Sequence, residues 1–389
     1  MDASSNDPST SHGPALAGLK VLDFSIMLAG PYAARLMADL GADVVKVEPP
    51  EGDDMRLRHP LREAPDGSKH STYFGQLNAG KRSLALNLKD PASVALVRRL
   101  ATQADVVIEN FRPGVMDRLG LGAATLRATN PRLVYCAISG YGQSGPAAGR
   151  AAYAMIVQAE SGYERTLMRY AGDRERPAAT ATFVADLLGG IYAFGAVQAA
   201  LLQRTRTGMG QVVDVALMDS MLNLLIYELQ EAQFPVAGTR ATYGPVSAAD
   251  GDVLIVPLSE RNYAAMAEVT GLPGLRDDPR FASVPSRGAH WTEMMRIVET
   301  WTRPRSVAEV LAAMEGAGVP CARYADPGDT LADPQAAVRG VFQPVDDAAG
   351  SFTGVNPPWL MSGGASAIGA RVPQLGEHNA EVLRDWLGD

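Results

Sequence analysis

Residues 19–48 read LKVLDFSIMLAGPYAARLMADLGADVVKVE, in which two short apolar runs flank an amphipathic segment. We expect strands at Leu19–Phe24 and Asp43–Glu48, joined by a helix that opens at Gly30-Pro31. Proline is tolerated at the first helical position because its missing N–H would have no partner there. A strand, a helix and a second strand form a parallel βαβ unit, whose sheet is covered on both faces. This stretch therefore predicts an α/β fold.

The same alternation continues along the N-terminal half of the chain. Further elements are expected as strands at Ser83–Asn87, Asp105–Glu109 and Leu133–Ser139, with a helix over Ala92–Gln103. Helices are also expected over three later stretches, Phe183–Gln203, Val212–Glu231 and Asn379–Leu387. Apolar strands separated by helices are typical of a large Rossmann-like domain built on a parallel sheet.

The composition of the chain changes near Pro235. From there to Asp252 glycine, proline and short strands predominate, and Asp250-Gly251 is expected to form a hairpin turn. Helices follow to about Arg323, bounded by loops rich in proline and arginine. Four segments are therefore expected: a flexible tail at 1–15, a large domain at 16–232, a small α+β domain at 233–330 and a C-terminal segment at 331–389.

Composition argues against several functional classes. Of the 389 residues, 47% are hydrophobic and 20% are charged, which is ordinary for a globular protein. The net charge of -8 argues against a nucleic-acid partner, because phosphate binding needs a basic face. Cys136 and Cys321 form no disulfide or zinc pattern, so we expect a cytoplasmic protein. The apolar run Phe183–Leu202 contains Asp186 and Gln198, which favours a buried helix over a membrane span.

Asp186 is the candidate functional residue that stands out most. It lies near the front of the apolar run TFVADLLGGIYAFG. Burying an unpaired carboxylate is costly, so an aspartate in such a place needs either partners or a chemical task. The alternative is that Asp186 caps the helix by accepting hydrogen bonds from free N–H groups. The residues alone favour the cap and leave a functional role open.

Two further features could hold a phosphate-bearing ligand. The first is a group of cations, namely Lys81, Arg82, Lys89, Arg112 and Arg118. Phosphate groups are bound by several donors near strand ends or helix N-termini, although scattered surface charge explains such residues equally well. The second is the glycine-rich turn GYGQSGP at 140–146, which follows a predicted strand and would let backbone N–H groups approach a ligand.

Other chemistries have weaker support. Glu48 ends the second strand, where dinucleotide-binding folds place a ribose-binding acid, but the first two glycines of G-x-G-x-x-G are missing. An ordinary sheet with a solvent-facing Glu48 is therefore favoured over nicotinamide or flavin binding. No metal-ligand spacing occurs among the five histidines, and no G-x-S-x-G motif suggests a serine hydrolase.

Seven segments in order resemble one known family. They are GLKVLDFSIMLAGPYAARLMADLGADVVKVEPPEGDDMR, NAGKRSLALNLK, DVVIENFRPGVMDRLGLG, ISGYGQSGP, ATFVADLLGGIYA, TGMGQVVDVALMDSMLNLL and QLGEHNAEVL. From about Leu16 to its end, the chain resembles the family III CoA-transferases. That group includes formyl-CoA:oxalate and carnitine CoA-transferases and the related α-methylacyl-CoA racemases. Each segment alone is weak, whereas seven in order are specific.

The resemblance implies an interlocked homodimer, in which the C-terminal segment returns to the large domain. It also implies that Asp186 is a nucleophile, because the family's catalytic aspartate lies in the same AD-x-x-GG context. Its carboxylate would attack an acyl-CoA thioester, and an aspartyl-CoA thioester would then pass CoA to an acceptor acid. The substrates implied are an acyl-CoA, with succinyl-CoA as the expected donor, and a small carboxylic acid. No permanently bound cofactor and no membrane partner are implied.

The resemblance also assigns binding residues. By similarity, Leu28 and Ala29 line the entrance for CoA. The other positions that match CoA-binding residues are Leu86, Lys89, Asn110, Phe111, Arg118, Gly140 and Tyr141. Pro49 replaces a basic residue that the family carries just after the second strand, so contacts to the adenine end of CoA are expected to differ.

Two rival functions remain open. The racemase branch exchanges an α-proton with a histidine about thirty residues before the aspartate, where this chain has Tyr153, so a transferase is favoured. The family's aspartate beside that position is Ala154 here. A run of glycines typical of the formyl-CoA branch is absent, which argues against oxalate specificity. The other rival is a CoA-binding protein without activity, against which an intact Asp186 counts.

Overall fold

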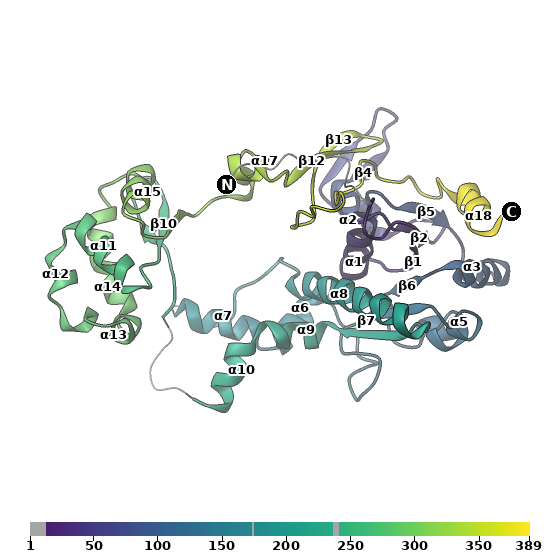
Figure 1. The fold of residues 1–389 in the computed structure, drawn as a ribbon, viewed down its shortest axis with the longest axis horizontal. Helices are drawn as coiled ribbons and strands as arrows, with labels where there is room; N and C mark the ends of the chain where they lie inside the picture. Colours follow the sequence, from purple (N-terminus) through teal and green to yellow (C-terminus); the bar gives the residue numbers. More distant parts are fainter. Residues whose placement is uncertain (1–12, 173–174, 236–240) are drawn as a thin grey trace. The chain divides into compact units, whose positions relative to one another are not determined.

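The computed structural model describes residues 13–172, 175–235 and 241–389, and the chain divides into two compact units (Figure 1). Unit 1 contains the described residues up to Arg165, together with Ala178–Ile226 and Pro334–Asp389. Unit 2 contains Thr166–Pro177 and Tyr227–Asp333. Most of the tail expected at 1–15 lies outside the described residues.

A six-stranded parallel sheet forms the centre of unit 1, in the order β5-β2-β1-β6-β7-β8. Its strands are β1 (Lys20–Asp23), β2 (Asp43–Glu48), β5 (Arg82–Ala85), β6 (Val106–Glu109), β7 (Val134–Ser139) and β8 (Val212–Ala216). The chain winds outwards first on one side of β1 and then on the other, so the direction reverses between β1 and β6. In such sheets ligands bind where the carboxyl ends of these two strands diverge. The predicted α/β fold with a parallel sheet is confirmed.

Helices cover both faces of this sheet. The helices that lie wholly in unit 1 are α1 (Ala29–Ala38), α2 (Thr72–Asn78), α3 (Pro91–Gln103), α4 (Val115–Arg118), α5 (Ala123–Thr129), α6 (Ala154–Glu160), α8 (Val184–Thr207), α9 (Leu217–Leu224), α17 (Pro334–Val338) and α18 (Asn379–Leu387). Of these, α2 and α17 contribute to neither core that flanks the sheet. Successive strand residues point to opposite faces, so Val21 packs with α1, α6, α8 and α9, whereas Leu22 packs with α3, α5 and α18. The two faces thus have separate apolar cores.

Smaller elements complete unit 1. They are the hairpins β3 (Leu61–Glu63) with β4 (Lys69–Ser71) and β12 (Phe342–Asp347) with β13 (Gly350–Val355), and the 3-10 turn η2 (Asp54–Leu57). Two helices, α7 (Tyr163–Ala171) and α10 (Ile226–Gln233), contribute residues to both units.

The helix predicted over Val212–Glu231 is wrong at its beginning. Val212–Ala216 forms β8, which pairs in parallel with β7, and the helices α9 and α10 follow it. The sequence VVDVA is rich in β-branched residues, which favour strands because their side chains pack well on a pleated surface. No glycine or proline separates this strand from α9, so the boundary carries no sequence signal.

The C-terminal segment covers the open edge of the sheet at β5. The backbone N–H of Ser83 donates to His378 Nδ1 at 3.1 Å, and that of Ala85 donates to Asn379 Oδ1 at 2.9 Å. Farther along, the buried Trp386 donates from its indole nitrogen to Asp43 Oδ2 at 2.7 Å. Figure 1 shows α18 beside β5. The exposed donors of an edge strand are thereby paired within the chain.

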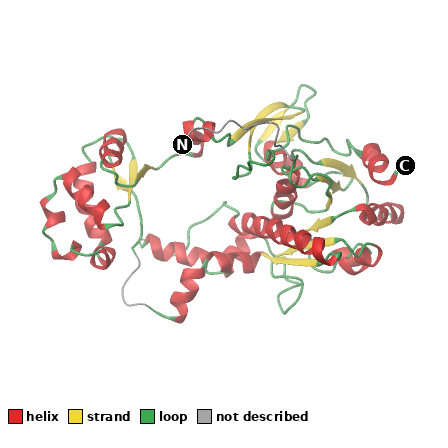
Figure 2. Ribbon diagram, viewed as in Figure 1, coloured by secondary structure: helices red, strands yellow, loops and turns green. Residues whose placement is uncertain are grey.

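Unit 2 has its own core and a small antiparallel sheet in the order β11-β10-β9 (Figure 2). Its strands are β9 (Val246–Ser247), β10 (Asp252–Ile255) and β11 (Cys321–Arg323). Its helical elements are α11 (Glu260–Thr270), α12 (Pro273–Arg276), η3 (Pro279–Phe281), α13 (Val284–Ala289), α14 (Trp291–Thr302), α15 (Val307–Gly316) and α16 (Pro327–Thr330). The hairpin expected at Asp250-Gly251 is confirmed, since β9 and β10 pair and Ala248 N donates to Gly251 O at 2.8 Å.

Candidate active site

The loop between β1 and α1 lies at the point where the sheet reverses direction. Within it Met27 has a φ of 61°, which is unusual for a residue with a side chain. The loop is also tight, since a Cβ on Gly30 would lie 2.2 Å from the Cβ of Ser25. Strained backbone of this kind persists only where the surroundings hold it in place, and it is common at binding sites.

Asn110 holds this loop against the end of β6. Its side-chain oxygen accepts from the backbone N–H of Ile26 at 2.8 Å, and its side-chain nitrogen donates to Ile26 O at 2.7 Å. Asn110 was expected to contact CoA, and both polar atoms of its amide are engaged with Ile26. Its role in this structure is to fix the loop.

A cavity of about 490 Å³ opens beside the loop, at the carboxyl ends of β1, β2, β5 and β6. Three of the expected CoA-binding residues line it, namely Leu86, Lys89 and Phe111. Met27 and Pro49 line it as well, so the position where the family carries a basic residue contributes an apolar wall. Its lining combines apolar surface with Lys89, which follows β5, and with four acidic residues at and after the end of β2, namely Glu48, Glu51, Asp53 and Asp54.

Unpaired cations lie near this cavity. Lys89, Arg112 and Arg118 are exposed, and none forms an ion pair with another described residue. Arg118 directly precedes Leu119, which lines the cavity. These side chains remain available for an anionic ligand, as phosphate binding requires.

Lys81 and Arg82, which were grouped with these cations, serve the fold instead. Lys81 is only 3% exposed and pairs with Asp23, with 2.8 Å between Nζ and Oδ2. Arg82 pairs with Asp43 and Asp385. Sequence alone did not separate these structural cations from the free ones, because the partners lie 39 or more residues away along the chain.

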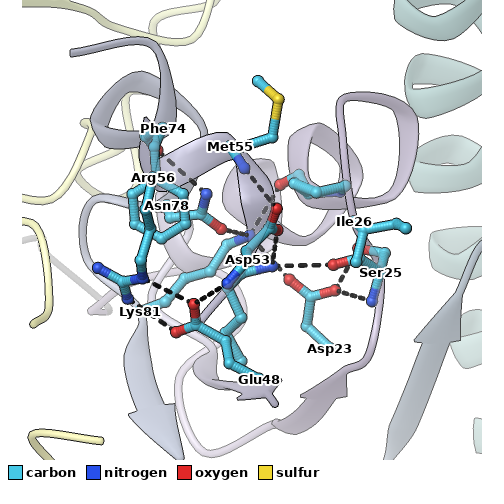
Figure 3. A network of polar contacts seen from close by, with 12 residues as sticks. Asp23, Ser25, Ile26, Glu48, Asp53, Met55, Arg56, Phe74, Asn78 and Lys81 are labelled. Carbon is cyan, nitrogen blue, oxygen red and sulfur yellow. Dashed lines mark hydrogen bonds and ion pairs between the residues drawn. The ribbon is translucent and has the colours of Figure 1, made fainter. Parts of the chain in front are cut away.

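The expectation that Glu48 faces solvent is wrong. Its side chain is buried and accepts from Arg56 Nε at 2.8 Å and Arg56 Nη2 at 2.7 Å, while Ser83 Oγ donates to it at 2.7 Å (Figure 3). Arg56 and the neighbouring Lys46 hold the pKa of Glu48 below its usual value. The carboxylate is thus fully engaged with the protein.

Asp186 is the third residue of α8, and it does not cap the helix. The residue at the N-cap position is Phe183, and α8 has no side-chain capping hydrogen bond. Among the described residues, none donates a hydrogen bond to the Asp186 carboxylate or forms an ion pair with it. The side chain is partly buried, and this burial raises the pKa of Asp186 to about 6. A partly buried ionisable group with a shifted pKa and no structural partner is a candidate for chemistry.

Two glycines bring α8 close to its neighbours one turn after Asp186. A Cβ on Gly190 would lie 2.7 Å from the carbonyl oxygen of Ala29, and one on Gly189 would lie 2.4 Å from Leu217 Cδ2. The start of α8 therefore lies directly against Ala29, at the start of α1. Asp186 thus lies one helical turn before the contact of α8 with Ala29, one of the two residues at the expected entrance for CoA.

An apolar cluster links the loop to the start of α8. It includes Leu28, Met27, Tyr73 and Phe183. The charge of Asp186 contributes to raising the pKa of Tyr73, so the phenol lies within electrostatic reach of the carboxylate. Sequence reasoning did not identify Tyr73, which follows a short hairpin and carries no motif of its own.

Gly140 and Tyr141 follow β7 and do not line the cavity. Tyr141 donates from its hydroxyl to Glu160 at 2.6 Å, and Arg150 lies over its ring at 4.8 Å. Gly140 has no room for a side chain, since a Cβ there would lie 2.3 Å from that of Ala152. The structure thus brings together the predicted residues near β1, β5 and β6, with Gly140 and Tyr141 farther along the sheet.

Helix α8 is also long and apolar enough to cross a membrane, with a mean hydropathy of 1.5 over its most apolar 18 residues. Helices α1, α6 and α9 pack against it in one core with the central sheet. Such packing is typical of the core helix of a globular unit.

Comparison with known proteins supports a single family. A model described as CoA-transferase family III matches residues 16–379. A succinate–glutarate CoA-transferase of Agrobacterium fabrum is 37% identical over 96% of each chain, and a formyl-CoA:oxalate CoA-transferase of Streptomyces avermitilis is 34% identical over 96% of each. The crystal structure of a CAIB/BAIF family protein from Brucella suis is 34% identical, covers 96% of this chain and 100% of its own, and superposes with a TM-score of 0.83. The chain thus belongs to CoA-transferase family III and transfers CoA from an acyl-CoA to a carboxylic acid.

Proposed function

We propose that this CoA-transferase works through a covalent aspartyl-CoA thioester on Asp186. The observation that carries the proposal is the state of that carboxylate, which is partly buried and has no hydrogen-bond or ion-pair partner among the described residues. It lies one helical turn before the point where α8 touches Ala29. A carboxylate that makes no structural hydrogen bond or ion pair, and that lies near the loop between β1 and α1, fits the role of a nucleophile.

The reaction follows in balanced steps. The carboxylate of Asp186 attacks the thioester carbonyl, and the C–S bond breaks to give a mixed anhydride and CoA thiolate. The thiolate then attacks the Asp186 carbonyl, which forms the aspartyl-CoA thioester and releases the donor as its carboxylate. The acceptor carboxylate repeats these steps in the opposite direction. Each step conserves the energy of an activated acyl group, and none requires an added oxidant or metal.

The cavity and its rim provide a site for the nucleotide end of CoA. Leu86 and Phe111 would contact the adenosine, and Lys89 and Arg118 would pair with its phosphate groups. The pantetheine arm would then run past Leu28 and Ala29 towards Asp186. For the substrates we propose succinyl-CoA and a small dicarboxylic acid, supported by relatives named as succinate–glutarate and succinyl-CoA:glutarate CoA-transferases.

Mass spectrometry of the intact protein tests this mechanism. Incubation with succinyl-CoA and no acceptor should increase the protein mass by that of CoA less one water. Borohydride should then reduce the adduct at Asp186, and hydroxylamine should remove CoA and leave a hydroxamate there. A panel of dicarboxylates would next identify the acceptor. A wild-type enzyme that transfers CoA without ever carrying the adduct would contradict the covalent mechanism.

The rate of adduct formation should depend on pH. Burial raises the pKa of Asp186 to about 6, and only the ionised form attacks a thioester. Below that pH the rate should fall by about tenfold per pH unit, and above it the rate should level off. Rapid quenching without acceptor isolates this step, because the acceptor acid and its own ionisation are then absent. A rate that stays constant from pH 7 to about pH 5 would contradict the role of Asp186 as a free carboxylate.

We also propose that a second copy of the chain covers an apolar face of unit 1. On α8, Ile191 is 47% exposed and Tyr192 is 42% exposed, and both line a groove of about 500 Å³ between α8, β8 and α9. Exposed apolar surface of this kind marks interaction sites. This exposed apolar surface and the resemblance to interlocked dimers support a homodimer. For localisation we propose the cytoplasm, because the free cysteines Cys136 and Cys321 suit a reducing compartment.

Ile191→Lys should prevent assembly of this homodimer. A buried lysine in the interface would lack a partner, so light scattering should report a monomer or an aggregate in place of the dimer. Val338→Lys is the matched control, because Val338 is 83% exposed on α17, away from this face. A wild-type protein that is monomeric at all concentrations would contradict the proposal.

A further inference from the structure

A network of buried charges lies beneath the loop between β1 and α1 (Figure 3). Its two amines belong to Lys46, which is fully buried, and Lys81, which is 3% exposed. Lys46 pairs with Asp53 at 2.9 Å, and Lys81 pairs with Asp23 at 2.8 Å. Neither amine reaches the cavity lining, and the transfer reaction described above uses neither of them.

Both amines also bind the backbone of the loop. Lys46 Nζ donates to Ser25 O at 2.8 Å, and Lys81 Nζ donates to Pro31 O at 2.9 Å. These two carbonyl groups stand on either side of Met27, the residue with strained backbone. Lys81 donates its remaining hydrogen bond to Asn78 Oδ1 at 2.9 Å, so its three donors are all used.

The acidic partner of Lys81 reaches the same loop. Asp23 Oδ1 accepts from the backbone N–H of Ser25 at 3.0 Å and from its hydroxyl group. The loop is thus held at its start by Asp23 and Lys46, at its centre by Asn110, and just after its end by Lys81. Side chains from two strands, and from the residues just after β6 and just before β5, hold one short segment.

Such a network is a costly way to stabilise a fold. Buried ion pairs can often be replaced by apolar side chains of similar volume without loss of stability, because charges lose their hydration on burial. What an apolar side chain cannot supply is a donor aimed at a fixed carbonyl oxygen. The network therefore fixes the backbone conformation of the loop. This loop connects the cavity, which Met27 lines, with Ala29, which contacts α8.

We propose that Lys46 and Lys81 are positioning residues for CoA transfer, which hold the Ser25–Pro31 loop so that a bound thioester stands within reach of Asp186. This inference rests on the proposed role of Asp186. An error of about 1 Å in the position of a reacting group can cost about 100-fold in rate. The expected signature is therefore a loss of kcat with little change in the KM for acyl-CoA.

Paired neutral variants test the proposal without leaving a lone buried charge. Asp23→Asn combined with Lys81→Met releases the Pro31 carbonyl, and Lys46→Met combined with Asp53→Asn releases the Ser25 carbonyl. In each, kcat should fall by about 100-fold. The KM for acyl-CoA should change by less than about threefold in the Asp23/Lys81 variant, which alters no residue of the cavity lining. Asp53 lines the cavity, so the Lys46/Asp53 variant is compared by kcat alone. The matched control is Arg35→Met combined with Asp39→Asn. Arg35 lies in α1 and Asp39 is its C-cap residue; they form a buried ion pair whose side chains make no hydrogen bond with the loop.

Thermal melting and kinetics well below the melting temperature separate positioning from stability. We expect all three paired variants to fold, and the rate of adduct formation on Asp186 to fall in the two network variants alone. Wild-type kcat in both network variants, or an equal loss in the control, would overturn the proposal. Because adduct formation by the wild type tests Asp186 separately, a failure of the network proposal leaves the covalent mechanism standing.

Discussion

Asp186→Asn should lower the rate of CoA transfer by about 10⁴-fold or more, which is the scale of loss when an enzyme's nucleophile is removed. The carboxamide keeps the size of the side chain but cannot attack a thioester at a useful rate. Asp186 makes no structural hydrogen bond or ion pair with other described residues. The melting temperature of the Asp186→Asn protein should therefore stay at or above that of the wild type. Steady-state transfer from succinyl-CoA measures the loss.

Binding provides the control for this variant. Calorimetry should show that Asp186→Asn binds CoA about as tightly as the wild type, since the cavity and its cations are unchanged. An Asp186→Asn enzyme with wild-type turnover would refute the covalent role of this residue. Deuterium exchange into a 2-methylacyl-CoA without acceptor would instead indicate a racemase, although Tyr153 stands where that branch has its histidine and is 62% exposed.

Gly190→Ala should both destabilise unit 1 and reduce activity. The new methyl group would meet the Ala29 carbonyl oxygen at 2.7 Å and Tyr32 Cδ1 at 3.3 Å, so α8 and α1 must separate. Overpacking of this kind costs about 1–3 kcal/mol, because the obstacle is backbone and cannot rotate away. Since Asp186 lies one turn earlier, the separation also moves the carboxylate from the loop. Denaturant unfolding and kcat measure the two effects.

Gly288→Ala is the matched control for this substitution. Gly288 lies in α13, and a Cβ there would have nothing within 4 Å. In open space, alanine in place of glycine stabilises a helix by up to about 1 kcal/mol. The two variants should therefore shift the free energy of unfolding in opposite directions. If Gly190→Ala matched Gly288→Ala in stability and kept full activity, the close contact of α8 with Ala29 would not matter for catalysis.

The elements that sequence predicted well are those with strong local patterns. Asp43–Glu48 and Asn379–Leu387 have the bounds that hydrophobic periodicity indicated, and α8 was expected within a few residues. The strand β8 was missed because its alternation runs straight into the next helix. Local pattern thus predicts elements, whereas their boundaries depend on pairing with strands that are distant in the sequence.

The sequence indicated several residues that line the cavity, but it did not indicate which side chains pair with one another. Leu86, Lys89 and Phe111 line one cavity, because each follows a strand at the carboxyl ends of the same sheet. The roles of Lys81 and Asn110 could not be read from sequence. Each role depends on a partner 50 or more residues away. No local sequence pattern distinguishes a buried, paired lysine from an exposed, unpaired one.

The return of the C-terminal segment to β5 has a consequence for biosynthesis. A ribosome completes residues 227–333 of unit 2 well before it reaches His378 and Asn379, which pair with β5. Unit 2 can therefore fold while translation continues. The backbone N–H groups of Ser83 and Ala85 on β5, in contrast, have no partner until the C-terminal segment has been made. During that interval the nascent chain is open to pairing with neighbouring polypeptides on the same messenger RNA.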